Sequence, residues 1–158
     1  MPTTKDVQIP SFYRFYFRWL DPAVCLWAVY MDFFTPDVVY NAFVPTTLAP
    51  RNPQHDFLLE QIGGALLMLA VLDIFMLRLT NDIKVWKTLQ AAVFLYDWVC
   101  LYSIYSALRR QDRLRWDAFR LLEDGGSIGI TVQAALVRAA FLLDVGLGRA
   151  KSAGEKRA

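Results

Sequence analysis

Cysteine and histidine are scarce in this chain, whose 158 residues include two cysteines and one histidine. The single histidine, His55, leaves no Cys/His spacing for a metal ion, so we expect no metal and no other cofactor. Cys25 and Cys100 both fall within apolar stretches, where a thiol behaves as a small hydrophobic side chain. We therefore interpret them as two buried free thiols, with a disulfide between them as the alternative.

A surplus of charge of one sign is also missing, because 17 lysines and arginines face 15 acidic residues. A net charge of +2, without a basic stripe that alternates with aromatics, argues against a nucleic-acid partner. A cleavable signal peptide is not expected either. Residues 1–11 are polar, and the first apolar stretch has arginines at its start and Asp21-Pro22 within it.

Apolar residues are abundant and concentrated in four long blocks, at residues 12–39, 57–79, 85–108 and 128–147. Each block has about 20 residues or more, the length that a helix needs to cross a hydrocarbon core of about 30 Å. Helices are the expected spanning form because lipid offers no hydrogen-bond partner to the backbone. The sequence therefore predicts an all-α integral membrane bundle of four transmembrane helices. It occupies residues 12–148, between a polar N-terminal segment (1–11) and a disordered basic tail (149–158).

A water-soluble four-helix bundle with wide apolar faces is the alternative. Residues 66–72 and 91–95 leave no polar stripe for water, which favours the lipid bilayer as the partner. Pro22 suits the start of a helix with Asp21 as its cap, so the buried part of the first span is expected to begin near Asp21. Residues 44–53 hold three prolines and are expected to form neither helix nor strand.

Four spans place both ends of the chain on one side of the membrane. That side carries ten of the 17 cations and the other side six, with Arg138 inside the last span. The positive-inside rule then predicts cytoplasmic termini, and we expect the endoplasmic reticulum as the membrane. Arg14 and Arg18, one helical turn apart, can extend toward the headgroups. The sequence leaves open whether copies of the chain form a homo-oligomer.

Ionisable residues inside the spans are the strongest functional signal, since each charge at mid-bilayer costs at least about 2.5–3.5 kcal/mol. Asp97 and Arg138 fall near the middle of the third and fourth spans, and Asp73 falls toward the end of the second that lies with the termini. One interpretation is that Asp97 and Arg138 form an ion pair that only links two helices. The other is that Asp73, Asp97 and Arg138 line a catalytic pocket. There a carboxyl group without a cationic partner donates a proton, and one held ionised by arginine accepts a proton.

Other side chains can be interpreted in two ways. The aromatics of the first and third spans could shape a pocket and stabilise positive charge, or could serve as interface anchors and packing; they are Trp27, Tyr30, Tyr96, Trp98, Tyr102 and Tyr105. Gly63-Gly64 permits a close helix approach. Residues 109–124 hold five arginines and four acids and are expected to be solvated, so Glu123 and Asp124 are interpreted as loop charges.

Four short motifs resemble a family of small fungal four-helix integral membrane proteins of unknown function. They are Leu20-Asp21-Pro22, Lys84-Val-Trp-Lys-Thr-Leu, Asp97-Trp-Val-Cys-Leu-Tyr-Ser and Val137-Arg-Ala-Ala-Phe-Leu-Leu-Asp-Val-Gly-Leu. The chain departs from the family at Cys100, where a histidine is common, and at residues 121–127, which replace a stretch that resembles Asp-Trp-Gly-Asn. The resemblance implies four helices and a fungal source. Because some relatives are associated with natural-product gene clusters, it also implies a role in secondary metabolism.

Together these signals favour a cofactor-independent membrane enzyme with Asp73, Asp97 and Arg138 as catalytic residues. It would open or cyclise an epoxide of a lipophilic terpenoid or polyketide, as an epoxide hydrolase or cyclase does. Some soluble epoxide hydrolases use a similar combination of aspartates and arginine. A non-catalytic membrane scaffold or lipid-binding protein is the alternative. A transporter is disfavoured, since four spans show no internal repeat and no broken helix.

Overall fold

The computed structural model describes residues 7–115 and 117–149, and within them the chain is helical apart from one pair of two-residue strands. The predicted all-α class is therefore confirmed. The basic tail predicted at 149–158 lies, from residue 150 on, outside the described residues. The elements follow one another in the order β1 (Val7–Gln8), α1 (Ser11–Phe15), η1 (Tyr16–Leu20), α2 (Asp21–Phe34), α3 (Pro36–Phe43), η2 (Pro53–His55), α4 (Asp56–Leu79), α5 (Ile83–Arg110), α6 (Glu123–Leu142) and β2 (Gly148–Arg149).

In the part of the chain that the structure describes, three helices are long and apolar enough to cross a membrane. They are α4 with the short η2 before it, α5 and α6, whose most apolar 18-residue windows have mean hydropathies of 2.1, 1.4 and 1.4. Large apolar side chains such as Phe75, Leu95 and Leu136 are exposed on these helices, whereas Asp73, Asp97 and Arg138 are buried. Apolar surface outside and charge inside is the reverse of a water-soluble bundle. The chain is a membrane protein.

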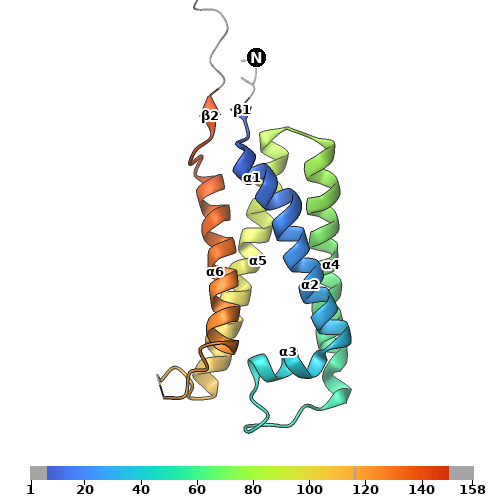
Figure 1. Ribbon diagram of the computed structural model, residues 1–158, viewed down its shortest axis with the longest axis vertical. Coiled ribbons are helices and arrows are strands. Elements are labelled where there is room, and N and C mark those ends of the chain that lie inside the picture. Colours follow the sequence, from blue (N-terminus) through green and yellow to red (C-terminus); the bar gives the residue numbers. More distant parts are fainter. Residues whose placement is uncertain (1–6, 116, 150–158) are drawn as a thin grey trace, which may run out of the picture.

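The first apolar block does not form the single regular span that was expected over residues 12–39. Helix α2 ends at Phe34, and Thr35 breaks the helix because its backbone leaves the helical region (φ −133°, ψ 50°). Pro36 then starts the separate helix α3, which runs across the end of the bundle farthest from the chain termini (Figure 1). Within the described residues, three helices rather than four thus have the length and composition of a span, and α2 alone has 14 residues.

Pro22 explains the irregular turn before α2. A proline ring clashes with the carbonyl four residues earlier and has no N–H to give it, so the carbonyl of Arg18 loses its helical partner. The chain widens into the π-helical segment η1, and the Asp21 N–H donates to the carbonyl of Tyr16, five residues back. The guanidinium of Arg78 donates instead to the Arg18 carbonyl, at 2.9 Å. The expectation that Asp21 caps a helix starting at Pro22 is therefore wrong, because the helical run begins at Ser11.

The long helices form two pairs, with α2 along α4 and α5 along α6 (Figure 1). The pairs meet at the end that holds the termini, where fully buried aromatic side chains of η1, α5 and α6 form the core: Phe17, Trp86 and Phe141. Beside this core β1 and β2 pair in antiparallel fashion, with Val7 opposite Arg149. The two ends of the described chain therefore lie side by side. At the opposite end α3 contacts α2, α5 and α6 and bridges the two pairs.

The contact between α2 and α4 depends on Gly63 and not on Gly64. A Cβ at position 63 would lie 2.8 Å from Cε2 of Phe33 and 3.2 Å from Cβ of Asp32, whereas a Cβ at position 64 would meet no heavy atom within 4 Å. Of the two glycines expected to allow close packing, only the first does so.

Gly63→Ala is therefore expected to lower the melting temperature of the detergent-solubilised protein, because α2 must move and overpacking typically costs about 1–3 kcal/mol. The matched control, Gly64→Ala, should leave the melting temperature unchanged or raise it, since alanine favours a helix over glycine by up to about 1 kcal/mol. Equal melting temperatures for the two variants would contradict the assigned contact.

Candidate functional site

The charged residues of the spans converge on the guanidinium of Arg138 in α6. Its Nη1 donates to Oδ2 of Asp97 in α5 at 2.7 Å, and its Nη2 donates to Oδ2 of Asp21 in α2 at 2.5 Å. Its Nε donates to Oε1 of Gln90, which lies two turns before Asp97 on the same helix, at 3.2 Å. Three helices are joined by one side chain, which is 2% exposed.

Gln90 extends this cluster to the fourth long helix. Its side-chain amide, fully buried, donates through Nε2 to Oδ1 of Asp73 in α4 at 3.1 Å. Oδ2 of Asp73 is also buried and has no hydrogen-bond partner among the described residues. The carboxyl group of Asp73 neighbours that of Asp21. We call these five residues, Asp21, Asp73, Gln90, Asp97 and Arg138, the central network.

The central network holds three carboxyl groups and one cation. Lone charges in a low-dielectric interior are costly, and a carboxylate needs hydrogen bonds to all of its oxygens to be well compensated. Asp21 and Asp97 each accept a hydrogen bond from Arg138, whereas among the described residues Asp73 accepts one from the amide of Gln90 and none from a cation. The network therefore contains one carboxyl group more than the guanidinium engages.

Asp73, Asp97 and Arg138, the three residues expected to form a site, are thus brought together. Two members of the network were missed. Gln90 lies seven residues before Asp97, so helical periodicity places both on one face of α5 and could have revealed it. Asp21 was assigned to a helix cap. Its position along the chain, however, places it at a depth in the membrane similar to that of Asp73, and this similarity could have indicated that it belongs to the network.

Access to the central network is narrow. Asp21 and Asp97 are 6% and 7% exposed, and Asp73 and Gln90 are fully buried. A pocket of about 390 Å³ lies nearby, between the second half of α5, the segment after it and the start of α6. Its apolar lining includes Leu101, Ile104 and Ile128, and it contains no member of the network. Within the described residues no His, Cys, Asp or Glu side chains group so as to hold a metal ion.

The aromatic side chains considered as pocket walls mostly face outward. Five of the six are exposed, namely Trp27, Tyr30, Trp98, Tyr102 and Tyr105, and of these only Tyr105 contributes to the 390 Å³ pocket. Their exposure fits lipid-facing anchors. Both cysteines are free and half-buried, so no disulfide joins Cys25 to Cys100.

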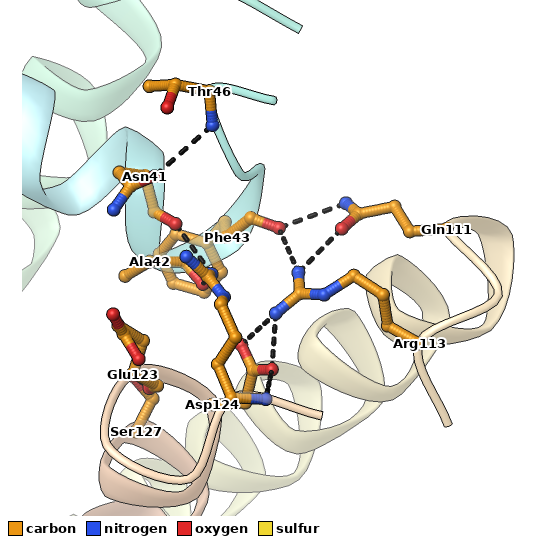
Figure 2. A network of polar contacts seen from close by, with 10 residues as sticks. Asn41, Ala42, Phe43, Thr46, Gln111, Arg113, Glu123, Asp124 and Ser127 are labelled. Carbon is orange, nitrogen blue, oxygen red and sulfur yellow. Dashed lines mark hydrogen bonds and ion pairs between the residues drawn. The ribbon is translucent and has the colours of Figure 1, made fainter. Parts of the chain in front are cut away.

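A second buried network closes the other end of the bundle (Figure 2). Asp124 in the first turn of α6 is 3% exposed and accepts hydrogen bonds from the guanidinium of Arg113, which is itself buried. Arg120 binds the carbonyls of Asn41 and Ala42 at the end of α3, at 2.6 and 2.9 Å. Arg113 and Gln111 reach the carbonyl of Phe43.

The interpretation of Asp124 as a solvated loop charge is therefore wrong, because Arg113 and Arg120 compensate it in a buried position. The last helix, α6, begins at Glu123 rather than at residue 128 and ends at Leu142 rather than at residue 147. Glu123 is exposed, as expected. Trp116, in the same arginine-rich segment, lies outside the described residues. This second network holds α3 against α6 and the segment between α5 and α6.

Arg138→Gln is expected to destabilise the protein strongly, because it leaves Asp21 and Asp97 buried without a cation, and breaking buried pairs costs about 3–5 kcal/mol. The matched control is Lys87→Gln. Lys87 pairs with Asp144 at 2.7 Å, but that carboxylate is 64% exposed, and exposed pairs contribute about 0–1 kcal/mol. Thermal unfolding in detergent measures both, and an equally small effect of the two substitutions would argue against the burial of charge at Arg138.

Comparison with known proteins places this arrangement in a family. The family model described as "Domain of unknown function (DUF7704)" matches residues 6–148, which include all the long helices and both buried networks. No curated protein matches the chain, and no solved structure matches it. The chain belongs to the DUF7704 family.

Proposed function

We propose that this protein is a small membrane enzyme that opens or cyclises an epoxide of a lipophilic terpenoid or polyketide by acid–base catalysis, without a cofactor. The observation that carries the proposal is the additional carboxyl group of the central network. Asp73 is fully buried, contacts no cation and leaves Oδ2 without a hydrogen bond among the described residues. Unusual carboxyl environments of this kind are concentrated at functional sites.

A purely structural link between helices does not require Asp73. Arg138 already joins α2, α5 and α6 through Asp21 and Asp97, and Gln90 could join α4 through a neutral partner. A third carboxyl group lowers stability unless it carries a proton. One proton shared by the neighbouring carboxyl groups of Asp73 and Asp21 would supply the missing hydrogen bond. The network then contains both a proton donor and, in Asp97, a carboxylate held ionised by arginine.

The reaction divides between these two groups. The Asp21/Asp73 pair donates its proton to the epoxide oxygen as one C–O bond breaks, which avoids a free alkoxide. Asp97 accepts a proton from the nucleophile, water for hydrolysis or a hydroxyl group of the substrate for cyclisation, as the new C–O bond forms. The substrate gains and loses one proton. The proton on Asp97 returns to the Asp21/Asp73 pair, and Arg138 between them compensates the changing charge.

The apolar pocket supports a lipophilic substrate. Leu101 in its lining follows Asp97 by four residues on the same face of α5, a rise of about 6 Å. Pockets that hold small molecules have volumes of about 300–1,000 Å³, and this one has about 390 Å³. A substrate dissolved in the bilayer could place its apolar body there and extend its epoxide toward Asp97. Such chemistry belongs to secondary metabolism, which fits the fungal natural-product context implied by the motifs.

The alternative is a non-catalytic scaffold or lipid-binding protein. The low exposure of the central network favours this alternative, because no member is more than 7% exposed. The enzyme and the scaffold can be told apart by replacing one carboxyl group of the central network with an amide. In an enzyme this change lowers turnover without unfolding the protein, whereas in a scaffold it acts only on stability.

We further propose that α1, η1 and α2 act together as a fourth crossing. The helical run from Ser11 to Phe34 is interrupted only by a change of hydrogen-bond pattern in η1. At about 1.5 Å per residue its length exceeds the hydrocarbon core of about 30 Å. Both termini then share one side, which the distribution of lysine and arginine favours as the cytoplasmic side of the endoplasmic reticulum.

Asp97→Asn and Asp73→Asn are each expected to fold almost normally, because the amide keeps the shape and can accept the existing hydrogen bonds. Turnover should fall by about 100- to 10,000-fold, the usual contribution of general acid–base catalysis. Glu123→Gln, on the exposed start of α6, serves as the control and should keep full activity. The assay is product formation in cells that co-express the protein and receive terminal epoxides of farnesol or squalene, alongside melting temperatures. Full turnover by both asparagine variants would exclude this site, and parallel loss of folded protein would favour the structural role.

Reporter tags at the two termini should give the same, cytoplasmic signal, and a tag inserted after Leu48, between α3 and α4, should report the opposite side. The reason is that four crossings return the chain to its starting side. Termini on opposite sides would mean that the run from Ser11 to Phe34 does not cross the membrane.

A further inference from the structure

Three arginines gather at the end of the bundle that holds the termini. Arg14 and Arg18 are one turn apart on α1 and η1, and Arg78 lies in the last turn of α4. Nη2 of Arg78 donates to the carbonyl of Arg18 at 2.9 Å, which brings the two guanidinium-bearing segments together. We call Arg14, Arg18 and Arg78 the arginine cluster.

Within residues 7–115 and 117–149, no member of the arginine cluster pairs with a carboxylate. The contacts of Arg18 are neutral: its Nε donates to the carbonyl of Leu77 at 2.8 Å, and its guanidinium lies 5.0 Å from the ring centre of Trp86. Nε of Arg14 is buried and has no hydrogen-bond partner there. Like charges gathered at one end of the bundle repel one another, and the described residues supply no carboxylate that pairs with them.

The environment of the arginine cluster is that of a membrane interface. Arg78 lies 4.6 Å from the ring centre of Trp19, a side chain that is 63% exposed. Phe15 and Leu79, beside the cluster in sequence, are also exposed. Tryptophan and arginine together at the end of a span are typical of the headgroup region, where an apolar surface continues into the acyl chains.

We propose that the arginine cluster binds the phosphate of an anionic phospholipid headgroup. Guanidinium groups match phosphate oxygens in bidentate geometry. Arg78 uses one N–H of Nη1 for the Ile74 carbonyl and one of Nη2 for the Arg18 carbonyl, and its second N–H on each nitrogen remains for such contacts. Among the described residues Nε of Arg14 has no partner, and Arg18 adds positive charge held in place by Leu77 and Trp86. The exposed Trp19 and Leu79 offer apolar surface for the lipid's chains, which a free phosphate ion would not use. This site lies apart from the central network and does not depend on its chemistry.

Native mass spectrometry of the detergent-solubilised full chain tests the proposal, with phosphatidylinositol and phosphatidylcholine as competing probes. The protein should retain phosphatidylinositol about tenfold more strongly, equivalent to about 1.4 kcal/mol. Arg14→Gln and Arg78→Gln should each remove most of that preference, whereas Arg14→Lys should keep part of it. The matched control, Arg109→Gln with Arg110→Gln, removes two exposed cations at the far end of α5 and should keep the preference.

Equal retention of the two lipids by the unchanged protein, or equal losses in the cluster and control variants, would overturn the proposal. Displacement of phosphatidylinositol by millimolar inorganic phosphate would also overturn it, in favour of a soluble anion. Melting temperatures identify any variant that fails to fold. Arg14→Gln is the decisive variant if Arg78→Gln unfolds, since Arg78 also binds the Arg18 carbonyl whereas Arg14 makes no such contact among the described residues.

Discussion

The buried guanidinium of Arg138 is the constraint on which the rest of the bundle depends. In a bilayer the hydrophobic effect does not drive helices together, because lipid chains are as apolar as leucine side chains. An arginine at the centre of a span must find anionic partners inside the protein. Its partners come from α2 and α5, and Gln90 carries the connection to α4. One charged side chain thus selects which helices are neighbours and at what depth.

The arginines at the two ends of the molecule have different kinds of partners. At the α3 end, Asp124 accepts hydrogen bonds from Arg113 and Arg120, and both guanidinium groups also donate to carbonyls at the end of α3. At the end that holds the termini, the described partners of the arginine cluster are backbone carbonyls, the side-chain amide of Asn81 and tryptophan faces. The first arrangement is self-contained and fixes a segment. The second is incomplete and suits a partner from the headgroup layer.

Pro22 connects the central network to the arginine cluster. By depriving the Arg18 carbonyl of its helical donor, it produces the π turn in η1 and provides the acceptor that Arg78 uses. Residues before and after that turn are therefore rotated relative to a regular helix. Arg18 and Trp19 meet the end of α4, while Asp21 enters the interior and meets Arg138. A single proline thus separates an interfacial face from a buried one.

The sequence by itself determined the all-α class, the membrane environment, three of the four spans predicted from it and the burial of Asp73, Asp97 and Arg138. These follow from block length and from the cost of charge in lipid, both local properties of the chain. Only the tertiary structure decided that Asp21 and Gln90 join the network and that Asp124 is buried. Helical periodicity and depth can place Asp21 and Gln90 inside the bundle, but the partner of each side chain depends on which residue of another segment lies opposite, and the local sequence does not record that. Burial of a charge can be inferred from its own helix, but its compensation is a property of the helices around it.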